Sequence, residues 1–160
     1  MTRVLVLWAE QTTPNLGVRV LAEGTAALLG RIVPDVEVVT QSYGYGPAPV
    51  NIGSPRALVR EFVLDSRGLK TWVRQFDLVV DTRAGDSFAD IYGAKRLRAM
   101  SAMAEFVHRC GVPLVMGPQT LGPFNSRLGA LIARRALASA AVVMARDHVS
   151  AEQSARLGRP

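Results

Sequence analysis

The sequence predicts a parallel α/β protein in which one sheet of about five strands carries helices on both faces. Short, continuous apolar runs alternate with longer segments whose apolar residues recur at helical spacing. Strands that are apolar on both sides are typical of parallel sheets covered by helices. The chain has 160 residues, which is the length of about one domain. With right-handed crossovers, this order of elements gives a single Rossmann-like, doubly wound domain.

The first half of the chain contains two of these strands. The run VLVLWA at 4–9 is a buried strand, and VEVVT at 36–40 is the next. Between them, residues 17–32 form a helix because apolar residues recur at 18, 21, 28, 29 and 32. A loop rich in Gly and Pro follows at 42–55. The segment 56–75 is helical, with a break near its Ser-Arg-Gly sequence at 66–68.

The second half repeats the alternation three times. The strands are FDLVVDT at 76–82, PLVMG at 113–117 and AVVMAR at 141–146. Each precedes a segment with an amphipathic pattern, so we expect helices at 95–109, 126–138 and 148–157.

Composition argues against several classes of function. The net charge of +6 comes almost entirely from Arg, but the basic residues are scattered and form no stripe with interleaved aromatics, so nucleic acid is not an expected partner. The single Cys110 and the two histidines argue against a disulfide and a metal site. The first apolar run is too short to span a membrane and Glu10 follows it, so we expect a cytoplasmic protein. The glycines after the first strand form no G-x-G-x-x-G pattern, which disfavours a dinucleotide cofactor.

Unusual polar and glycine-bearing stretches gather at one end of the predicted strands. They are TTPNLG at 12–17, RAGDSFADIYG at 83–93, GPQTLGPFNS at 117–126 and RDHVS at 146–150. Each follows the carboxyl end of a strand, whereas the opposite ends carry plain connections such as RCGVP. Open α/β sheets bind their ligands at the carboxyl ends. The asymmetry therefore predicts a binding site along that edge.

Three stretches resemble the polysaccharide pyruvyl transferase family: FDLVVDTRAGDSFADIYG, GVPLVMGPQTLGPFNSRLGALIARRAL and VVMARDHVSAEQSARLG. The resemblance runs from about residue 15 to 158. It implies transfer of the enolpyruvyl unit of phosphoenolpyruvate to a saccharide hydroxyl, with no other cofactor. It also implies a fold like one half of a GT-B glycosyltransferase. The chain matches the amino-terminal half of that arrangement, so a separate carboxyl-terminal half is an expected partner.

The resemblance and the strand ends together select candidate site residues. Asp90 is the candidate that orients or deprotonates the acceptor hydroxyl. Capping of the next helix is the alternative role for Asp86, and Ser150 has capping-box spacing with Gln153. Arg146 could hold a phosphate or carboxylate, or pair with Asp147. The full set of substrate-binding candidates is Asn15, Gly17, Gly85, Asp86, Gln119, Gly122, Arg146 and Ser150.

Two departures from the family pattern keep a second interpretation open. The family's early N-x-G-D reads Asn15-Leu16-Gly17-Val18, which lacks the carboxylate, and its Gly pair after the third strand reads Ala84-Gly85. A truncated or degenerate α/β domain that binds a ligand or partner without turnover is therefore the alternative function.

Overall fold

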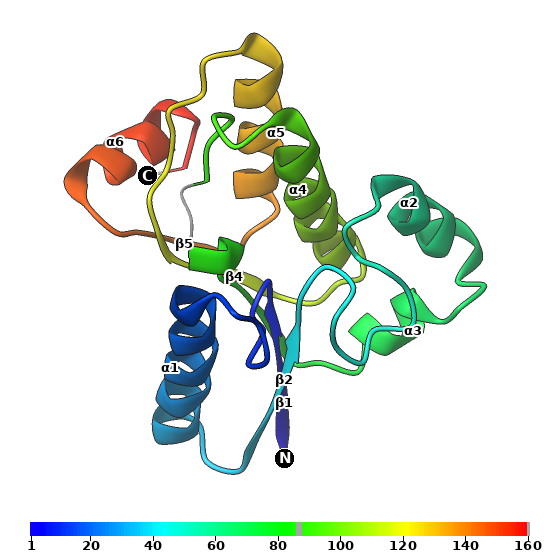
Figure 1. The fold of residues 1–160 in the computed structure, drawn as a ribbon. Coiled ribbons are helices and arrows are strands. Elements are labelled where there is room, and N and C mark those ends of the chain that lie inside the picture. Colours follow the sequence, from blue (N-terminus) through cyan, green and yellow to red (C-terminus); the bar gives the residue numbers. More distant parts are fainter. Residues whose placement is uncertain (86–87, 160) are drawn as a thin grey trace.

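The computed structural model describes residues 1–85 and 88–159. Five strands alternate with helices along the chain (Figure 1). The strands are β1 (Thr2–Leu7), β2 (Val36–Gln41), β3 (Leu78–Asp81), β4 (Leu114–Gln119) and β5 (Val142–Ala145). The helices are α1 (Leu16–Ile32), α2 (Pro55–Leu64), α3 (Leu69–Val73), the 3-10 turn η1 (Arg83–Gly85), α4 (Ala94–Arg109), α5 (Arg127–Ala138) and α6 (His148–Arg156).

The strands form one parallel sheet in the order β2-β1-β3-β4-β5. The chain passes from β1 to β2 at one edge of the sheet. It then crosses to β3 on the opposite side of β1 and continues through β4 to β5 at the other edge. The strand order therefore reverses between β1 and β3, and a crevice at such a reversal is where open α/β sheets bind ligands. The predicted fold class, a Rossmann-like parallel sheet with helices, is confirmed.

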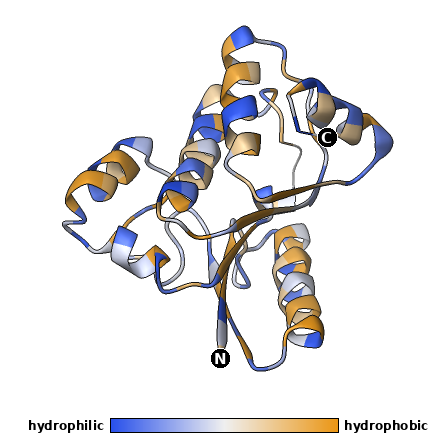
Figure 2. Ribbon diagram, turned by 180° about the vertical axis from the view of Figure 1, so that it is seen from behind, coloured by the Kyte–Doolittle hydropathy of each residue, from blue (hydrophilic) through white to orange (hydrophobic). Residues whose placement is uncertain are grey.

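The two faces of the sheet are covered unequally. One face packs against α2, α3, α4 and α5 around a large apolar core that includes Leu5, Val79 and Met116. The other face carries α1, whose Ala22 and Leu29 pack on Val4 and Val6. Figure 1 shows α1 alone on its side of the sheet, and Figure 2 shows the apolar strands between the two layers.

An apolar groove of about 250 Å³ lies beside α1 on the less covered face. Leu28 and Ile32 of α1 border it, together with Val80 and Val115 of the central strands and Met144 of β5. The outermost strand is open on this side, with Val142 46% and Met144 43% exposed. Although the sequence of β5 is continuously apolar, only one of its faces, with Val143 and Ala145, packs against the described core.

The differences from the predicted boundaries have local causes. The first strand ends at Leu7, two residues early, because Trp8 adopts a left-handed backbone with φ 62°. The predicted break in the 56–75 segment is confirmed, since Asp65 and Gly68 take positive φ values between α2 and α3. None of the helices in the described ranges is both long and apolar enough to cross a membrane.

Candidate functional site

The loops that follow β1, β3, β4 and β5 lie along one edge of the sheet, as expected for parallel strands. We call this edge the carboxyl rim; its described residues are 8–15, 82–85, 88–93, 120–126 and 146–147. Every candidate among the described residues lies in a rim loop, at the end of a strand or in the first turns of the helix that follows. Asp86 lies outside the described residues.

The backbone is strained on both sides of the crevice between β1 and β3. Trp8 ends β1 with φ 62°, and Arg83, Ala84 and Gly85 after β3 have φ values of 50°, 58° and 73°. Left-handed conformations cost non-glycine residues about 1–2 kcal/mol each. Such strain gathers at functional sites, where the surrounding structure holds it in place. The observed strain therefore points to the same crevice as the strand order.

A buried ion pair, which the motif analysis did not select, supports this strained turn. Arg83 Nε lies 3.2 Å from Asp81 Oδ2, and the two side chains are 1% and 0% exposed. Asp81 Oδ1 also accepts a hydrogen bond from the Arg83 backbone N–H at 3.0 Å. Burial raises the pKa of Asp81, and the Arg83 guanidinium acts against that shift. The sequence feature that could have predicted this ion pair is the presence of two charged residues at the end of an apolar strand, because charged side chains are rarely buried unless they are paired.

The Arg83 guanidinium stacks on an aromatic ring and leaves polar hydrogens unused. Its carbon lies 4.2 Å from the centroid of the Phe88 ring. None of its three nitrogens meets hydrogen-bond geometry with an acceptor in the described part of the chain. Arg96 Nη2 donates to the Arg83 carbonyl at 2.9 Å, which fixes the turn to α4.

On the α1 side of the rim, Asn15 begins the helix. Its side-chain oxygen accepts hydrogen bonds from the Gly17 and Val18 backbone N–H groups at 3.0 and 3.3 Å. A β-carbon at Gly17 would lie 3.3 Å from that oxygen, so the glycine gives the cap its room. A β-carbon at Gly85 of η1 would lie 3.3 Å from Leu21 Cδ2 of α1. Asn15, Gly17 and Gly85 therefore belong to one neighbourhood beside the β1–β3 crevice.

The loops after β3 and β4 are joined to each other beyond the sheet. Phe88 N–H donates to the Thr120 carbonyl at 2.7 Å, and Gly122 N–H donates to the Phe88 carbonyl at 2.8 Å. Gly122 has φ 81° and is followed by a cis bond to Pro123. The helix after β5 joins the same assembly, because the buried Ser150 Oγ accepts the Leu121 N–H at 3.0 Å. Ser150 thus connects α6 to the loop of β4.

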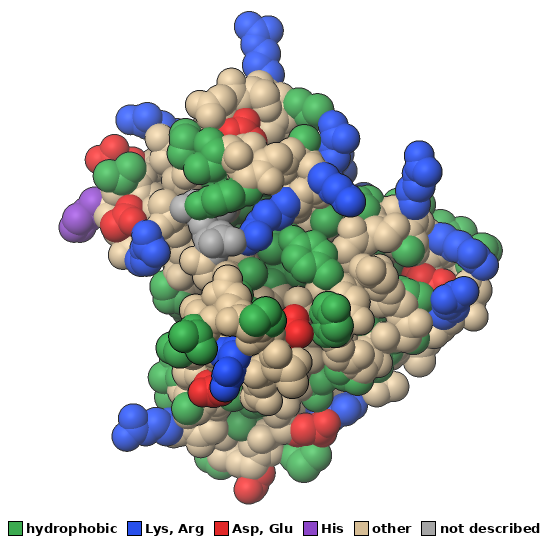
Figure 3. Space-filling model, in the orientation of Figure 1, with side chains coloured by type: hydrophobic (Ala, Val, Ile, Leu, Met, Phe, Trp, Pro, Cys, Tyr) green, Lys and Arg blue, Asp and Glu red, His purple; other side chains and the backbone are tan. Residues whose placement is uncertain are grey.

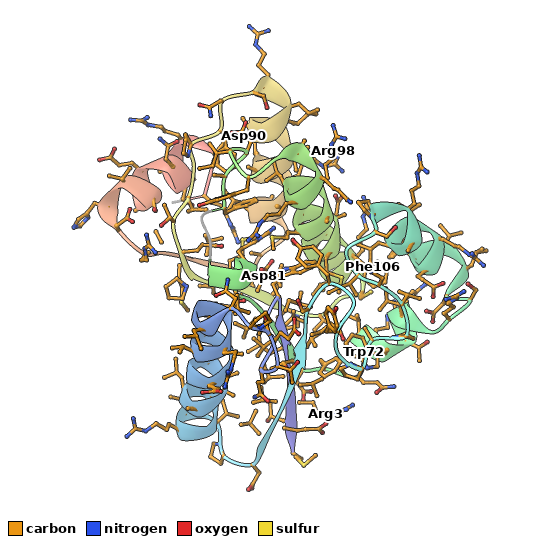
Figure 4. All side chains as sticks on the ribbon, in the orientation of Figure 1. Arg3, Trp72, Asp81, Asp90, Arg98 and Phe106 are labelled. Atoms are coloured by element: carbon orange, nitrogen blue, oxygen red, sulfur yellow. The ribbon has the colours of Figure 1, made fainter. Side chains whose placement is uncertain are left out.

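Asp90 is the main link between these two loops. Its carboxylate accepts backbone hydrogen bonds from Asn125 at 3.0 Å and Ser126 at 2.9 Å, and a third from Ser126 Oγ at 3.1 Å. Asn125 Nδ2 lies 3.4 Å from the same carboxylate. The Asn125 and Ser126 backbone N–H groups hold the pKa of Asp90 below its usual range. Figure 4 shows Asp90 near the ends of α4 and α5, well apart from Asp81. The geometry gives Asp90 a charged form at neutral pH and the role of a clamp at the start of α5.

The two remaining candidates, Gln119 and Arg146, are neighbours across β4 and β5. The Arg146 N–H donates to the Gln119 carbonyl at 3.1 Å. The Gln119 side chain is 3% exposed, and its amide oxygen and nitrogen have no partner within the described ranges. The Arg146 side chain is 62% exposed and lies 3.9 Å from the Asp147 carboxylate, a weak contact in water. Arg146 is therefore accessible to an anion.

The structure brings the candidates together in two groups. Asn15, Gly17 and Gly85 lie beside α1, while Asp90, Gly122 and Ser150 lie on the joined loops of β3 to α6. Asp90 lines a hollow of about 290 Å³ between α4 and α5, with Arg98 and Ser126 among its other borders. Across residues 1–85 and 88–159, no three His, Cys, Asp or Glu side chains gather to hold a metal ion.

The fold and the rim define a parallel α/β protein with its polar, glycine-bearing loops where such sheets bind ligands. Residues 15–160 match the family model described as polysaccharide pyruvyl transferase, so the chain belongs to that family. Searches of curated proteins and of solved structures find no match to the chain. The suspected family is thus confirmed by its sequence model.

Proposed function

We propose that this chain takes part in pyruvyl transfer from phosphoenolpyruvate to a saccharide and forms one wall of the catalytic cleft. The observation that carries the proposal is the family match over residues 15–160, because it includes all the rim loops after β3, β4 and β5. The other wall would come from a second, Rossmann-like half. The family resemblance implies both this division of the cleft between two halves and phosphoenolpyruvate as the donor.

The proposed reaction balances without a redox partner. A proton adds to the methylene carbon of phosphoenolpyruvate while a saccharide hydroxyl adds to the carbon that bears phosphate. A second hydroxyl of the same saccharide then displaces inorganic phosphate, which leaves a pyruvate ketal on the sugar. Of the two hydroxyl protons, one replaces the proton added to the methylene carbon and the other is taken up by the departing phosphate, so no proton is gained or lost overall. The protein must therefore bind an anionic donor and orient neutral hydroxyls.

The charge distribution at the rim supports separate places for donor and acceptor. The amino ends of α5 and α6 already carry the carboxylates of Asp90 and Asp147, which accept backbone N–H groups there. The first turn of α1 contains no acidic residue and is capped by neutral Asn15. A helix amino end favours anions. We therefore place the donor's phosphate or carboxylate near Asn15 and Gly17, and the saccharide on the loops of β3 to β5.

In this arrangement Asp90, Gln119 and Arg146 have different proposed tasks. Asp90 is ionised and can accept a hydrogen bond from an acceptor hydroxyl, although its lowered pKa makes it a weak proton acceptor. Gln119 offers both a donor and an acceptor that the described residues leave unused. The exposed Arg146 can pair with an anionic group in bidentate fashion. The remaining candidates, Gly85, Asp86, Gly122 and Ser150, would shape the loops around these groups.

The test is release of inorganic phosphate from phosphoenolpyruvate in the presence of a panel of glycans. The assay uses the chain alone and the chain mixed with a separately expressed carboxyl-terminal half of a family member. Arg146→Ala should reduce activity at least tenfold, whereas the control Arg31→Ala, an exposed arginine in the last turn of α1 and distant from its amino end, should leave it unchanged. Absence of glycan-dependent phosphate release under both conditions would end the enzymatic proposal.

A non-catalytic binding domain is the second candidate, and one observation favours it. Ala84 occupies a left-handed position where the family pattern has Gly, and the adjacent Arg83 side chain is buried beside it. This turn is therefore altered relative to the family. Under this alternative the chain binds glycans, as measured by calorimetry, but releases no phosphate from phosphoenolpyruvate.

A further inference from the structure

The outer face of α2 separates its charges in an unusual way. We define the α2 outer face by its exposed residues, which are Arg56, Val59, Arg60, Val63 and Leu64. Its one acidic residue, Glu61, turns inward and is 2% exposed. Glu61 accepts hydrogen bonds from Ser66 Oγ at 2.9 Å and from the Arg67 N–H at 3.0 Å. The carboxylate of Glu61 is thus hydrogen-bonded inside the protein, whereas the arginines of α2 are exposed to solvent.

The apolar residues of the α2 outer face are largely exposed to solvent. Val59, Val63 and Leu64 are 66%, 71% and 64% exposed, side by side with Arg56 and Arg60. Figure 3 shows hydrophobic and basic side chains mixed over α2, at the right of the view. Helices that lie in a membrane interface combine basic side chains, which meet the headgroups, with exposed apolar side chains, which enter the acyl boundary.

A basic hollow adjoins the same helix. It has a volume of about 400 Å³ and is bordered by Arg56, Arg60 and Arg67 and also by the inward-turned Glu61. No carboxylate within the described ranges contacts the guanidinium group of any of these three arginines. The oxygens of Glu61 are occupied by the Ser66 hydroxyl and by the backbone N–H groups of Arg67 and Leu69. Asp65 is directed to α3, where it accepts the Lys70 N–H at 2.7 Å. The hollow therefore carries three arginines against one carboxylate, and this net positive charge complements a phosphate-bearing headgroup.

We propose that the α2 outer face docks the protein on an anionic lipid bilayer. The arginines complement the negative lipid headgroups, and the two valines and Leu64 enter the boundary between headgroups and acyl chains. Nucleic acid fits the same charges less well, because this face offers aliphatic side chains and not the aromatic platforms that stack on bases. This inference does not depend on the proposed pyruvyl transfer.

The test measures cosedimentation of the full chain with lipid vesicles. Vesicles of phosphatidylcholine with phosphatidylglycerol should bind the protein, and binding should fall as salt is raised. Vesicles of phosphatidylcholine alone should bind it weakly. The variant Arg56→Ala/Arg60→Ala should bind anionic vesicles about 25-fold more weakly, from about fivefold for each arginine near the surface. Val59→Ser/Val63→Ser should weaken binding about tenfold while retaining the salt dependence.

A matched control separates this face from net charge alone. Arg19→Ala/Arg31→Ala removes the same charge from α1, on the opposite side of the sheet (Figure 1), and should leave binding unchanged. All four arginines are exposed, so circular dichroism should show both variants folded as the parent. Equal loss in both double variants, or no binding to anionic vesicles, would overturn the proposal. Full competition by soluble glycerol phosphate would also overturn it, since that result describes a small-anion site.

Discussion

Asp90 shows how one carboxylate can hold two loops, and its contacts define a pH effect. Because its pKa is lowered in the folded state, its stabilising contribution is present above the pKa of the unfolded chain, near pH 4. That contribution disappears as the pH falls through the folded-state value. Asp90→Asn should therefore lower the free energy of unfolding by about 1 kcal/mol at pH 7, and by less at pH 3.

Urea unfolding of both proteins at the two pH values measures this difference. Glu152→Gln serves as the control, since Glu152 contacts only Arg156 at 3.8 Å on an exposed helix surface. An equal destabilisation by Asp90→Asn at both pH values would show that the clamp does not depend on charge.

The left-handed conformation of Ala84 makes a second prediction at the residue scale. Ala84→Gly relieves a φ of 58°, so it should raise the free energy of unfolding by about 0.5–1 kcal/mol. Ala27→Gly, at an exposed position in α1, should lower it by about 1 kcal/mol. Thermal unfolding measures both. Two changes of the same sign would contradict the strained turn.

Cys110 should be chemically inert in the folded protein. It is buried at the end of α4, and burial raises the pKa of its thiol to about 11. At pH 8 the thiolate is therefore scarce, and the reaction with a disulfide reagent should be about two orders of magnitude slower than in denaturant. A native rate that matches the denatured rate would place the sulfur in contact with solvent.

At the scale of elements, α5 and α1 respond oppositely to the same substitution. A β-carbon at Gly129 of α5 would lie 2.7 Å from Asp90 Oδ2, whereas a β-carbon at Gly30 of α1 meets no atom within 4 Å. Gly129→Ala should therefore lower stability by about 1–2 kcal/mol through the displaced clamp. Gly30→Ala should raise it by about 0.5–1 kcal/mol. Chemical denaturation of the two variants checks the opposite signs; stabilisation by both would show that Asp90 moves aside freely.

The elements were predictable because their signal is periodic, whereas the site contacts depend on distant residues. Every strand and helix expected from the apolar pattern is present, and the 56–75 segment is divided near the predicted break. The clamp was not foreseen, because nothing in the local sequence connects Asp90 to Ser126, 36 residues away. The role of Gly129 as clearance for a carboxylate was equally hidden, since a helical glycine alone indicates little. Arg83 was not among the predicted site residues, because the family motif at this turn is defined by a Gly pair, which is Ala84-Gly85 in this chain.

At the scale of the whole molecule, the sheet separates two differently built sides. The side with α2, α3, α4 and α5 holds the large core, the Asp90 clamp and the basic outer face of α2. The side with α1 is thinner and leaves an apolar groove along β3, β4 and β5. The overall architecture followed from the sequence, but this inequality did not, because continuous apolar strands predict cover on both faces.

The carboxyl rim has two regions that we expect to differ in mobility: the joined loops after β3 and β4, and the segment after β1. Hydrogen bonds tie residues 88–90, 120–126 and Ser150 into one unit, while residues 10–14 bond to near neighbours within the part of the chain that the structure describes. Amide exchange should therefore be slow at Phe88, Leu121 and Gly122 and fast between 10 and 14. Uniform exchange along the rim would refute this division. A ligand at this edge would therefore contact a hydrogen-bonded loop unit on one side and the less constrained segment after β1 on the other.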